Sequence, residues 1–99
     1  MSMANIIAEQ ARLIMLRALD EQPSARLNSD LLIAELEGFG ITKTRDWVHE
    51  ELRCLAEIGA VRVVDAGSVR VAHLTDKGRD HVERRIVLEG VKRPSPVGL

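Results

Sequence analysis

A change in hydrophobic spacing at Gly59 limits the possible folds of this chain more than any other feature. Before it, apolar side chains from Trp47 to Ile58 recur at the spacing of an amphipathic helix. After it, "AVRVVD" and "SVRVAHL" are β-branched runs with the alternation of strands, separated by "AGS". The sequence therefore predicts a helix that runs directly into a β-hairpin with its tip near Gly67.

Two helices are expected before this point. Apolar residues recur at helical spacing over about residues 4–19, and "DEQPSARLN" then breaks the helix because Pro23 cannot continue it. A second, short helix is expected over roughly residues 30–37, capped by Asn28 or Ser29. It stops at "GFG", whose glycines permit a sharp turn.

The third helix is expected to start after this turn, capped by Thr42 or Thr44. Two helices joined by a tight, glycine-containing turn form a helix-turn-helix. A last helix is expected from its cap, Thr75, to about Val87. The predicted fold is therefore α+β: a mainly helical winged helix-turn-helix, with three helices, a two-stranded hairpin and a C-terminal helix.

The chain is expected to divide into one domain and a tail. Its 99 residues suit a single small domain, which we place at residues 1–88. The remaining "EGVKRPSPVGL" holds two prolines and two glycines, which predicts a flexible basic tail over residues 89–99. We consider Lys92–Pro96 a possible contact for a protein partner, docked as an extended strand.

Charge is unevenly distributed along the chain. Residues 1–66 hold seven Lys/Arg and eleven Asp/Glu, a net charge of −4, whereas residues 67–99 hold seven and four, a net charge of +3. This asymmetry suits an anionic partner, although a solvated surface with a basic tail would look the same. A single cysteine, no apolar run long enough to span a bilayer and no secretion signal favour a cytoplasmic protein without membrane contact.

The third helix separates on a helical wheel into a core face and a solvent face. Trp47 on this helix, and Phe39 just before it, are expected to anchor the core. Glu51 falls on the core face, where an unpaired carboxylate would be costly, so it should reach the edge or pair with an arginine. Glu57 lies four residues after Arg53, a spacing that favours an ion pair.

Two resemblances support the predicted fold. "LAEIGAVRVVDAGSVRVAHLTDKG" resembles the reading helix, wing and "LT–x–x–G" helix start of bacterial winged-helix regulators of the ArsR and MarR kind. "ARLIMLRALDEQP", "RDWVHEELRCLAEIG" and "GVKRPSP" resemble a family of small winged-helix proteins of Mu-like prophages and transposable phages. The likeness spans nearly the whole chain and implies a phage protein with a regulator-like fold.

The predicted function is that of a phage or prophage DNA-binding protein in transcriptional control. The N-terminal part of a reading helix meets base edges, where arginine can bond guanine and Thr or Lys can hold phosphate. By analogy with winged-helix regulators, wing residues would meet the neighbouring minor groove or phosphates. The residues predicted to bind double-stranded DNA are Lys43, Thr44, Arg45, His49, Arg53, Arg62, Ser68 and Arg70.

The acidic residues of the third helix keep an alternative open. Asp46 and Glu50 share the solvent face with the predicted DNA contacts, and either could be repelled by phosphate. A protein-interaction module of phage assembly or host takeover, which does not read DNA, is the rival hypothesis.

A homodimer is expected through the first helix and, secondarily, the last, because regulators of this kind bind paired half-sites. No catalytic residue, metal site or cofactor is predicted, since His49, His73 and His81 follow no ligand spacing.

Overall fold

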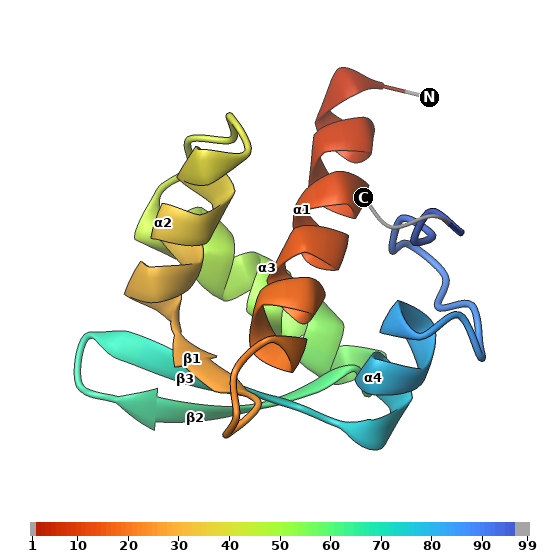
Figure 1. Cartoon of the computed structure of the whole chain (residues 1–99). Helices are drawn as coiled ribbons and strands as arrows, with labels where there is room; N and C mark the ends of the chain where they lie inside the picture. The colour runs from red at the N-terminus through yellow and green to blue at the C-terminus, as the bar shows by residue number, and fades with distance from the viewer. Residues whose placement is uncertain (1, 97–99) are drawn as a thin grey trace.

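The structure, a computed structural model, describes residues 2–96. Over this range the chain forms four helices and three strands, shown in Figure 1. In chain order they are α1 (Met3–Asp20), β1 (Arg26–Asn28), α2 (Ser29–Gly38), α3 (Arg45–Glu57), β2 (Val61–Ala66), β3 (Val69–Leu74) and α4 (Asp76–Val82). None of these helices, within the described range, has the length and apolar character needed to cross a membrane.

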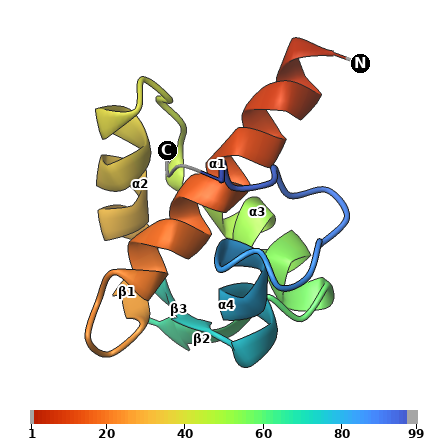
Figure 2. The same ribbon diagram turned by 45° about the vertical axis from the view of Figure 1, so that its right-hand side comes forward.

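The helices pack over one antiparallel sheet with the strand order β1-β3-β2. Figures 1 and 2 show α1 standing across the middle of the molecule, with α2 on one side and α4 and the C-terminal segment on the other. The side chains that α1 buries form the centre of the core. Leu16 of α1 meets Leu52 of α3 and Ala72 of β3 in this core, and none of the three has exposed surface. This arrangement confirms the predicted α+β winged-helix fold.

Each helix begins at a side-chain cap. Ser2, Asn28, Thr44 and Thr75 each accept a hydrogen bond from the backbone amide three residues further on. Such caps satisfy amides that have no partner inside the helix. The structure thus selects Asn28 as the cap of α2 and Thr44 as the cap of α3, and it confirms Thr75 as the cap of α4.

The ends of α2, α3 and α4 share one backbone motif. In each, a residue with positive φ is followed by one whose amide donates to the carbonyl five residues earlier, as in a Schellman motif. Gly40 and Gly59 take the positive-φ position after α2 and α3, as expected. After α4 this position is taken by Arg84, with φ of 65°. The last helix therefore ends at Val82, and the expectation that it reaches Val87 was wrong. The sequence did not indicate this end because no glycine stands there.

The strand β1 was not predicted. Its three residues lie within the segment that the sequence indicated as a loop, and they turn the expected two-stranded hairpin into a three-stranded sheet. β1 forms because Leu27 pairs with Ala72 of β3 and packs against the core. Ala25, with φ of 56°, makes the turn before it, and its carbonyl accepts the amide of Leu74.

The aromatic side chains are less buried than expected. Phe39 is 46% exposed, so the prediction that it anchors the core was wrong. It lies in the turn that ends α2, and Ile41 enters the core in its place. Trp47 is half-buried and packs against the edge of the core.

The "LT–x–x–G" sequence at the start of α4 forms a close junction with the end of α3. The Thr75 hydroxyl lies 2.6 Å from the Gly59 carbonyl oxygen and 2.9 Å from that of Ala60. A Cβ atom on Gly78 would lie 2.2 Å from the Ala60 carbonyl oxygen. Only glycine therefore allows α4 to approach this closely.

The C-terminal segment packs on the domain where a flexible tail was predicted from residue 89. Leu88 and Val91 are buried, and the amide of Lys92 donates to the Glu9 carbonyl of α1. The fully buried His81 holds both ends of this stretch: its Nδ1 accepts the Leu88 amide at 3.0 Å, and its Nε2 lies 2.9 Å from the Lys92 carbonyl oxygen. Because Nδ1 accepts, Nε2 carries the proton and donates. Residues 97–99 of the predicted tail lie outside the described part.

Candidate nucleic-acid interface

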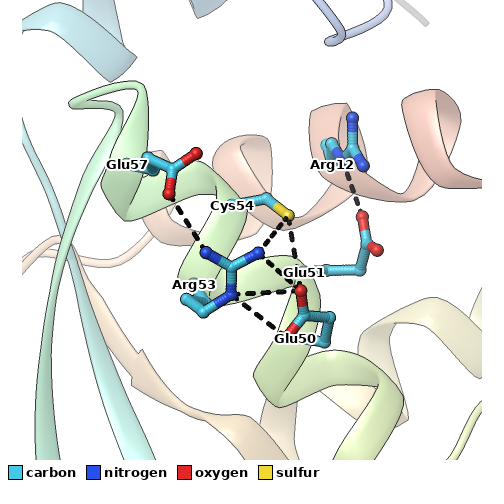
Figure 3. Close-up of polar contacts among 6 residues, drawn as sticks. All are labelled: Arg12, Glu50, Glu51, Arg53, Cys54 and Glu57. Atoms are coloured by element: carbon cyan, nitrogen blue, oxygen red, sulfur yellow. Dashed lines mark hydrogen bonds and ion pairs between the residues drawn. The ribbon is translucent and has the colours of Figure 1, made fainter.

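The helix α3 is anchored in the core by one face. Val48, Leu52 and Leu55 are fully buried along it. Glu51 lies among them with 7% exposure, and its carboxylate accepts from Nε of Arg12 at 2.6 Å (Figure 3). The expectation that Glu51 pairs with an arginine is confirmed. This pair satisfies a carboxylate that would otherwise be buried without a partner on the core face of α3.

Arg53, on the opposite face of α3, is held by two carboxylates. Figure 3 shows its guanidinium between Glu50 and Glu57, at 2.7 and 3.1 Å. The Glu50 hydrogen bonds and charge raise the pKa of Arg53, and the Arg53 hydrogen bond lowers the pKa of Glu50. The predicted pairing with Glu57 is confirmed, and Glu50 joins it. Glu50, one of the two acids that seemed to oppose DNA binding, is thus partly neutralised, but so is Arg53.

Arg45, in the first turn of α3, binds across the helix-turn-helix to α2. Its Nε and Nη2 atoms donate to the two oxygens of Asp30 at 3.0 and 3.1 Å. The Asp30 hydrogen bonds raise the pKa of Arg45. Both side chains are about half exposed, at 45% and 47%, so the pair forms in contact with solvent. Sequence patterns missed this pair because Asp30 and Arg45 lie on different helices.

His49 lies where α3, α2 and the wing meet. Its Nε2 is 2.8 Å from the hydroxyl oxygen of Ser29, which also accepts the backbone amide of Arg70 at 3.1 Å. Burial lowers the pKa of His49, and the charges of Arg70 and Arg45 lower it further. The carboxylates of Asp46 and Asp30 act in the opposite direction with smaller effect.

An open groove of about 360 Å³ runs between the first turns of α3 and the tip of the hairpin. We call it the α3–wing groove. It is lined by Arg45, Asp46, His49, Asp65, Gly67, Ser68, Val69 and Arg70. Arg70 forms an ion pair with Asp65 at 3.3 Å on the neighbouring strand. Four predicted DNA contacts, namely Arg45, His49, Ser68 and Arg70, therefore come together at one place.

The other predicted contacts lie elsewhere. Arg62 pairs with His73 across the sheet, whereas Arg70 pairs with Asp65. Because side chains alternate along a strand, this register puts Arg62 and Arg70 on opposite faces of the sheet. On the outer face Arg26 completes a row with His73 and Arg62. Burial lowers the pKa of His73, with added effects of Arg62 and Arg26.

The remaining two candidates lie at the start of α3. The Lys43 ammonium lies 5.0 Å from the centre of the Trp47 ring, within the range of a cation–π contact. The hydroxyl of Thr44 accepts the Trp47 amide as the helix cap. The Ser29 hydroxyl contacts both His49 and the Arg70 amide, but the sequence did not indicate Ser29 as part of the site. It indicated Ser29 only as a possible cap of α2.

Residues 2–96 hold no cluster of potential metal ligands. Across that range, no three His, Cys, Asp or Glu side chains lie together in a way that could hold a metal ion.

No protein-family model matches the chain, but one sequence relative does. The chain is 35% identical over 92 residues to the uncharacterized protein gp26 of Escherichia phage Mu. The match covers 93% of this chain and 95% of that protein.

Two solved structures have a similar fold. The winged-helix DNA-binding protein of STIV matches with a TM-score of 0.59 and 27% identity, over 74% of this chain and 79% of that chain. A MarR family transcriptional regulator from Streptomyces coelicolor, in complex with DNA, matches with a TM-score of 0.56 and 31% identity. That match covers 76% of this chain but 45% of the regulator, so the likeness is to less than half of its length. Both neighbours are DNA-binding proteins rather than enzymes.

Proposed function

We propose that this chain, which belongs to the same family as gp26 of Escherichia phage Mu, is a phage winged-helix protein that binds double-stranded DNA in transcriptional control. The DNA binding of its structural neighbours supports the proposal at the level of the fold. The α3–wing groove supports it at the level of the site. A regulator of phage genes would act in the cytoplasm of the bacterial host.

The observation that carries the proposal is the meeting of two arginines and a serine hydroxyl in the α3–wing groove. Arg45 comes from the first turn of α3, and Ser68 and Arg70 come from the wing, although each arginine already has an exposed carboxylate partner. A phosphate placed in the α3–wing groove would meet two arginines and the Ser68 hydroxyl. These are groups that commonly bind phosphate in DNA complexes.

DNA binding would require the arginines to exchange their partners. The pairs Arg45–Asp30 and Arg70–Asp65 are exposed on both sides, and ion pairs in contact with solvent contribute little to stability. Exchange of either carboxylate for a phosphate is therefore inexpensive. Arg53 has two carboxylates to leave, so we expect its contribution to DNA binding to be smaller.

The remaining candidates take subsidiary roles in the proposal. Lys43 and Thr44, at the N-terminal end of α3, would contact phosphates beside the major groove. Arg62 faces away from the α3–wing groove and could reach only a separate part of the duplex. We expect its replacement to affect binding less than that of Arg70.

We also propose a homodimer formed through α1 and the end of α4. Met3 and Ile6 are exposed in the first turns of α1, and Ile86 and Val87 are exposed after α4. A dimer would bury these side chains and place two copies of α3 on paired half-sites. A monomeric mass at working concentration would contradict this part of the proposal.

The proposal is tested by fluorescence anisotropy with the full chain, a labelled random duplex and a duplex from the DNA flanking its gene. Binding should weaken steeply with added salt, because each phosphate contact releases counterions. Arg45→Ala and Arg70→Ala should each weaken binding about tenfold, and Arg70→Ala should reduce the salt slope by about 1. Arg79→Ala, far from the groove, is the matched control. If neither duplex binds at low salt, the proposal fails.

A second candidate function is favoured by the ion pairs of α3. Arg53 and Arg45 are neutralised by carboxylates of the chain itself, as would suit a surface that recognises protein. In this case the fold would serve phage assembly or host takeover without reading DNA. The anisotropy experiment separates the two, since only the first predicts salt-dependent DNA binding that Arg70→Ala weakens.

A further inference from the structure

The lysines and arginines of this chain fall into two groups according to their partners. Six of the fourteen form an ion pair with a carboxylate: Arg12, Arg45, Arg53, Arg70, Arg79 and Arg85. Of the others, Arg17, Lys92 and Arg93 lie around one groove and have no carboxylate partner among residues 2–96. Three like charges held together without compensation attract an anion.

This groove, which we call the C-terminal groove, is lined by Leu13 and Arg17 of α1 and by residues 92–96. It has a volume of about 440 Å³. Its lining combines apolar side chains, from Leu13 and two prolines, with the three cations. Arg93 also borders a smaller hollow with Arg84, another arginine without an ion pair among the described residues.

One atom of the lining residue Arg17 lacks the partner that its burial demands. Nε of Arg17 is inaccessible to solvent and has no hydrogen-bond acceptor. A buried donor on a charged group without an acceptor is costly, and native structures almost always satisfy it. An incoming carboxylate beside the Arg17 guanidinium would compensate its charge.

The wall of the groove is held in place by the fold. His81 binds the Leu88 amide and the Lys92 carbonyl, the Lys92 amide donates to Glu9, and Nη1 of Arg12 donates to the Gly90 carbonyl. Pro94 and Pro96 restrict the backbone that follows. The backbone that carries Lys92 and Arg93 is thus positioned before any ligand arrives, which reduces the entropy lost on binding.

The location of the groove favours protein over DNA as its occupant. Figure 1 places the C-terminal segment on one side of α1 and the turn between β2 and β3 on the other, at opposite sides of the molecule. DNA seated on α3 and the wing would not reach it. The apolar part of the lining also has no counterpart on a phosphate backbone, whereas a peptide with apolar and acidic side chains satisfies both parts.

We propose that the C-terminal groove binds an acidic peptide segment of a protein partner, with its carboxylates on Arg17, Lys92 and Arg93 and an apolar side chain against Leu13. The segment itself would be short and extended. The proposal goes beyond DNA recognition and does not depend on it, because the two surfaces share no lining residue.

The test is a titration of the full chain with a fluorescein-labelled peptide in which leucines alternate with pairs of glutamates. A matched peptide carries glutamine in place of every glutamate. The glutamate peptide should bind, with an affinity that falls as salt is added, and the glutamine peptide should bind at least about tenfold more weakly. Equal binding of the two peptides, or binding of neither, would overturn the proposal.

Variants then locate the binding. Arg93→Glu should weaken binding of the glutamate peptide about tenfold or more, and Arg17→Met, which keeps the apolar stem, about fivefold. Arg85→Ala is the matched control, because its charge is already paired with Asp80 and Glu83, and it should leave binding unchanged. Should Arg17→Met fail to fold, Arg93→Glu on the exposed rim carries the test alone.

Two further results would count against an acidic peptide as the ligand. If Arg85→Ala weakens peptide binding as much as Arg93→Glu does, the peptide senses overall charge rather than this groove. If duplex DNA displaces the peptide and Arg93→Glu weakens DNA binding equally, the groove belongs to a nucleic-acid surface. Arg70→Ala should leave peptide binding unchanged, so failure of DNA binding and failure of peptide binding are distinguishable.

Discussion

The α3–wing groove and the C-terminal groove hold their cations in different ways. In the first, Arg45 and Arg70 each contact a carboxylate of the chain itself. In the second, Arg17, Lys92 and Arg93 have no such partner within residues 2–96. A ligand of the first must displace a carboxylate, whereas a ligand of the second only adds one. The number of basic residues in a surface is therefore a poor guide to its attraction for anions. That attraction depends on whether the basic residues already have carboxylate partners.

The largest expected effect is a loss of stability of the whole fold, and with it of both grooves. It comes from the junction of α3 with α4. Gly78→Ala places a Cβ atom 2.2 Å from the Ala60 carbonyl oxygen, so the backbone must move. We expect the free energy of unfolding to fall by about 3 kcal/mol or more, measured by urea denaturation. Gly38→Ala is the control, because nothing lies within 4 Å of its added Cβ, and its stability should stay within about 1 kcal/mol of the parent.

The second effect concerns Arg12, which joins α3 to the C-terminal segment. Arg12→Met leaves Glu51 nearly buried without a partner and removes the hydrogen bond to Gly90. We expect a loss of about 2–3 kcal/mol in the free energy of unfolding, somewhat below the range for fully buried pairs because Arg12 is 21% exposed. Arg79→Met, which breaks a more exposed pair with Asp20, should cost about 1 kcal/mol or less. Equal losses would show that the burial of Glu51 is not what matters.

The third effect relieves strain beside the C-terminal groove. Arg84 has φ of 65°, a conformation that costs a residue with a Cβ atom about 1–2 kcal/mol. Arg84→Gly should therefore raise the free energy of unfolding by about 1 kcal/mol, and the end of α4 should stay at Val82. Thermal unfolding measures this, with Arg85→Gly, outside the positive-φ position, as a control that should lower stability. A destabilised Arg84→Gly variant would contradict the assignment.

The fourth effect comes from removing the carboxylate partner of Arg45. This arginine is then unpaired, like the cations of the C-terminal groove. Asp30→Asn keeps a hydrogen-bonding side chain beside Arg45 but removes the negative charge. The affinity for duplex DNA should rise about threefold to fivefold, the worth of one exposed ion pair. Glu37→Gln, an acid of α2 without an ion pair in the described structure, should change the affinity less. An unchanged affinity for Asp30→Asn would mean that Arg45 does not contact DNA.

The smallest effect is a dependence of DNA binding on pH. In the free protein the pKa of His49 lies below its ordinary value of 6.5, so the ring is neutral at pH 7. A nearby phosphate favours the charged ring and raises this pKa, so DNA binding takes up a proton and strengthens as the pH falls. We expect about a threefold gain between pH of about 7.5 and about 6, lost in His49→Gln. His73→Gln, on the outer face of the sheet, should keep the gain.

Much of the fold could be predicted because its signals are local. The glycines after α2 and α3 and the caps Thr44 and Thr75 depend on residues only a few positions apart. The end of α4 could not be predicted in this way, since Arg84 takes a positive φ that its residue type does not indicate. β1 was missed because three residues carry no periodicity, and only their pairing with β3 makes them a strand.

The candidate site was less predictable because its contacts cross between elements. The pairing of Arg53 with Glu57 follows from helix spacing, but that of Arg45 with Asp30 needs the angle between two helices. The sequence was sufficient to predict that Arg62 and Arg70 lie on opposite faces of the sheet. A two-residue turn at the hairpin tip fixes the register, and the register places the two on opposite faces.

The two contacts of Arg12 have a consequence for how the grooves work together. Its guanidinium binds Glu51 of α3 with Nε and the Gly90 carbonyl with Nη1. A peptide that shifted Gly90 would also shift α3 through Arg12, and peptide and DNA would then alter each other's affinity. Thermodynamic reciprocity then requires the two factors to be equal, whichever ligand is added first. Titrations with both ligands present measure this coupling; two affinities that never change would show that Arg12 only supports the fold.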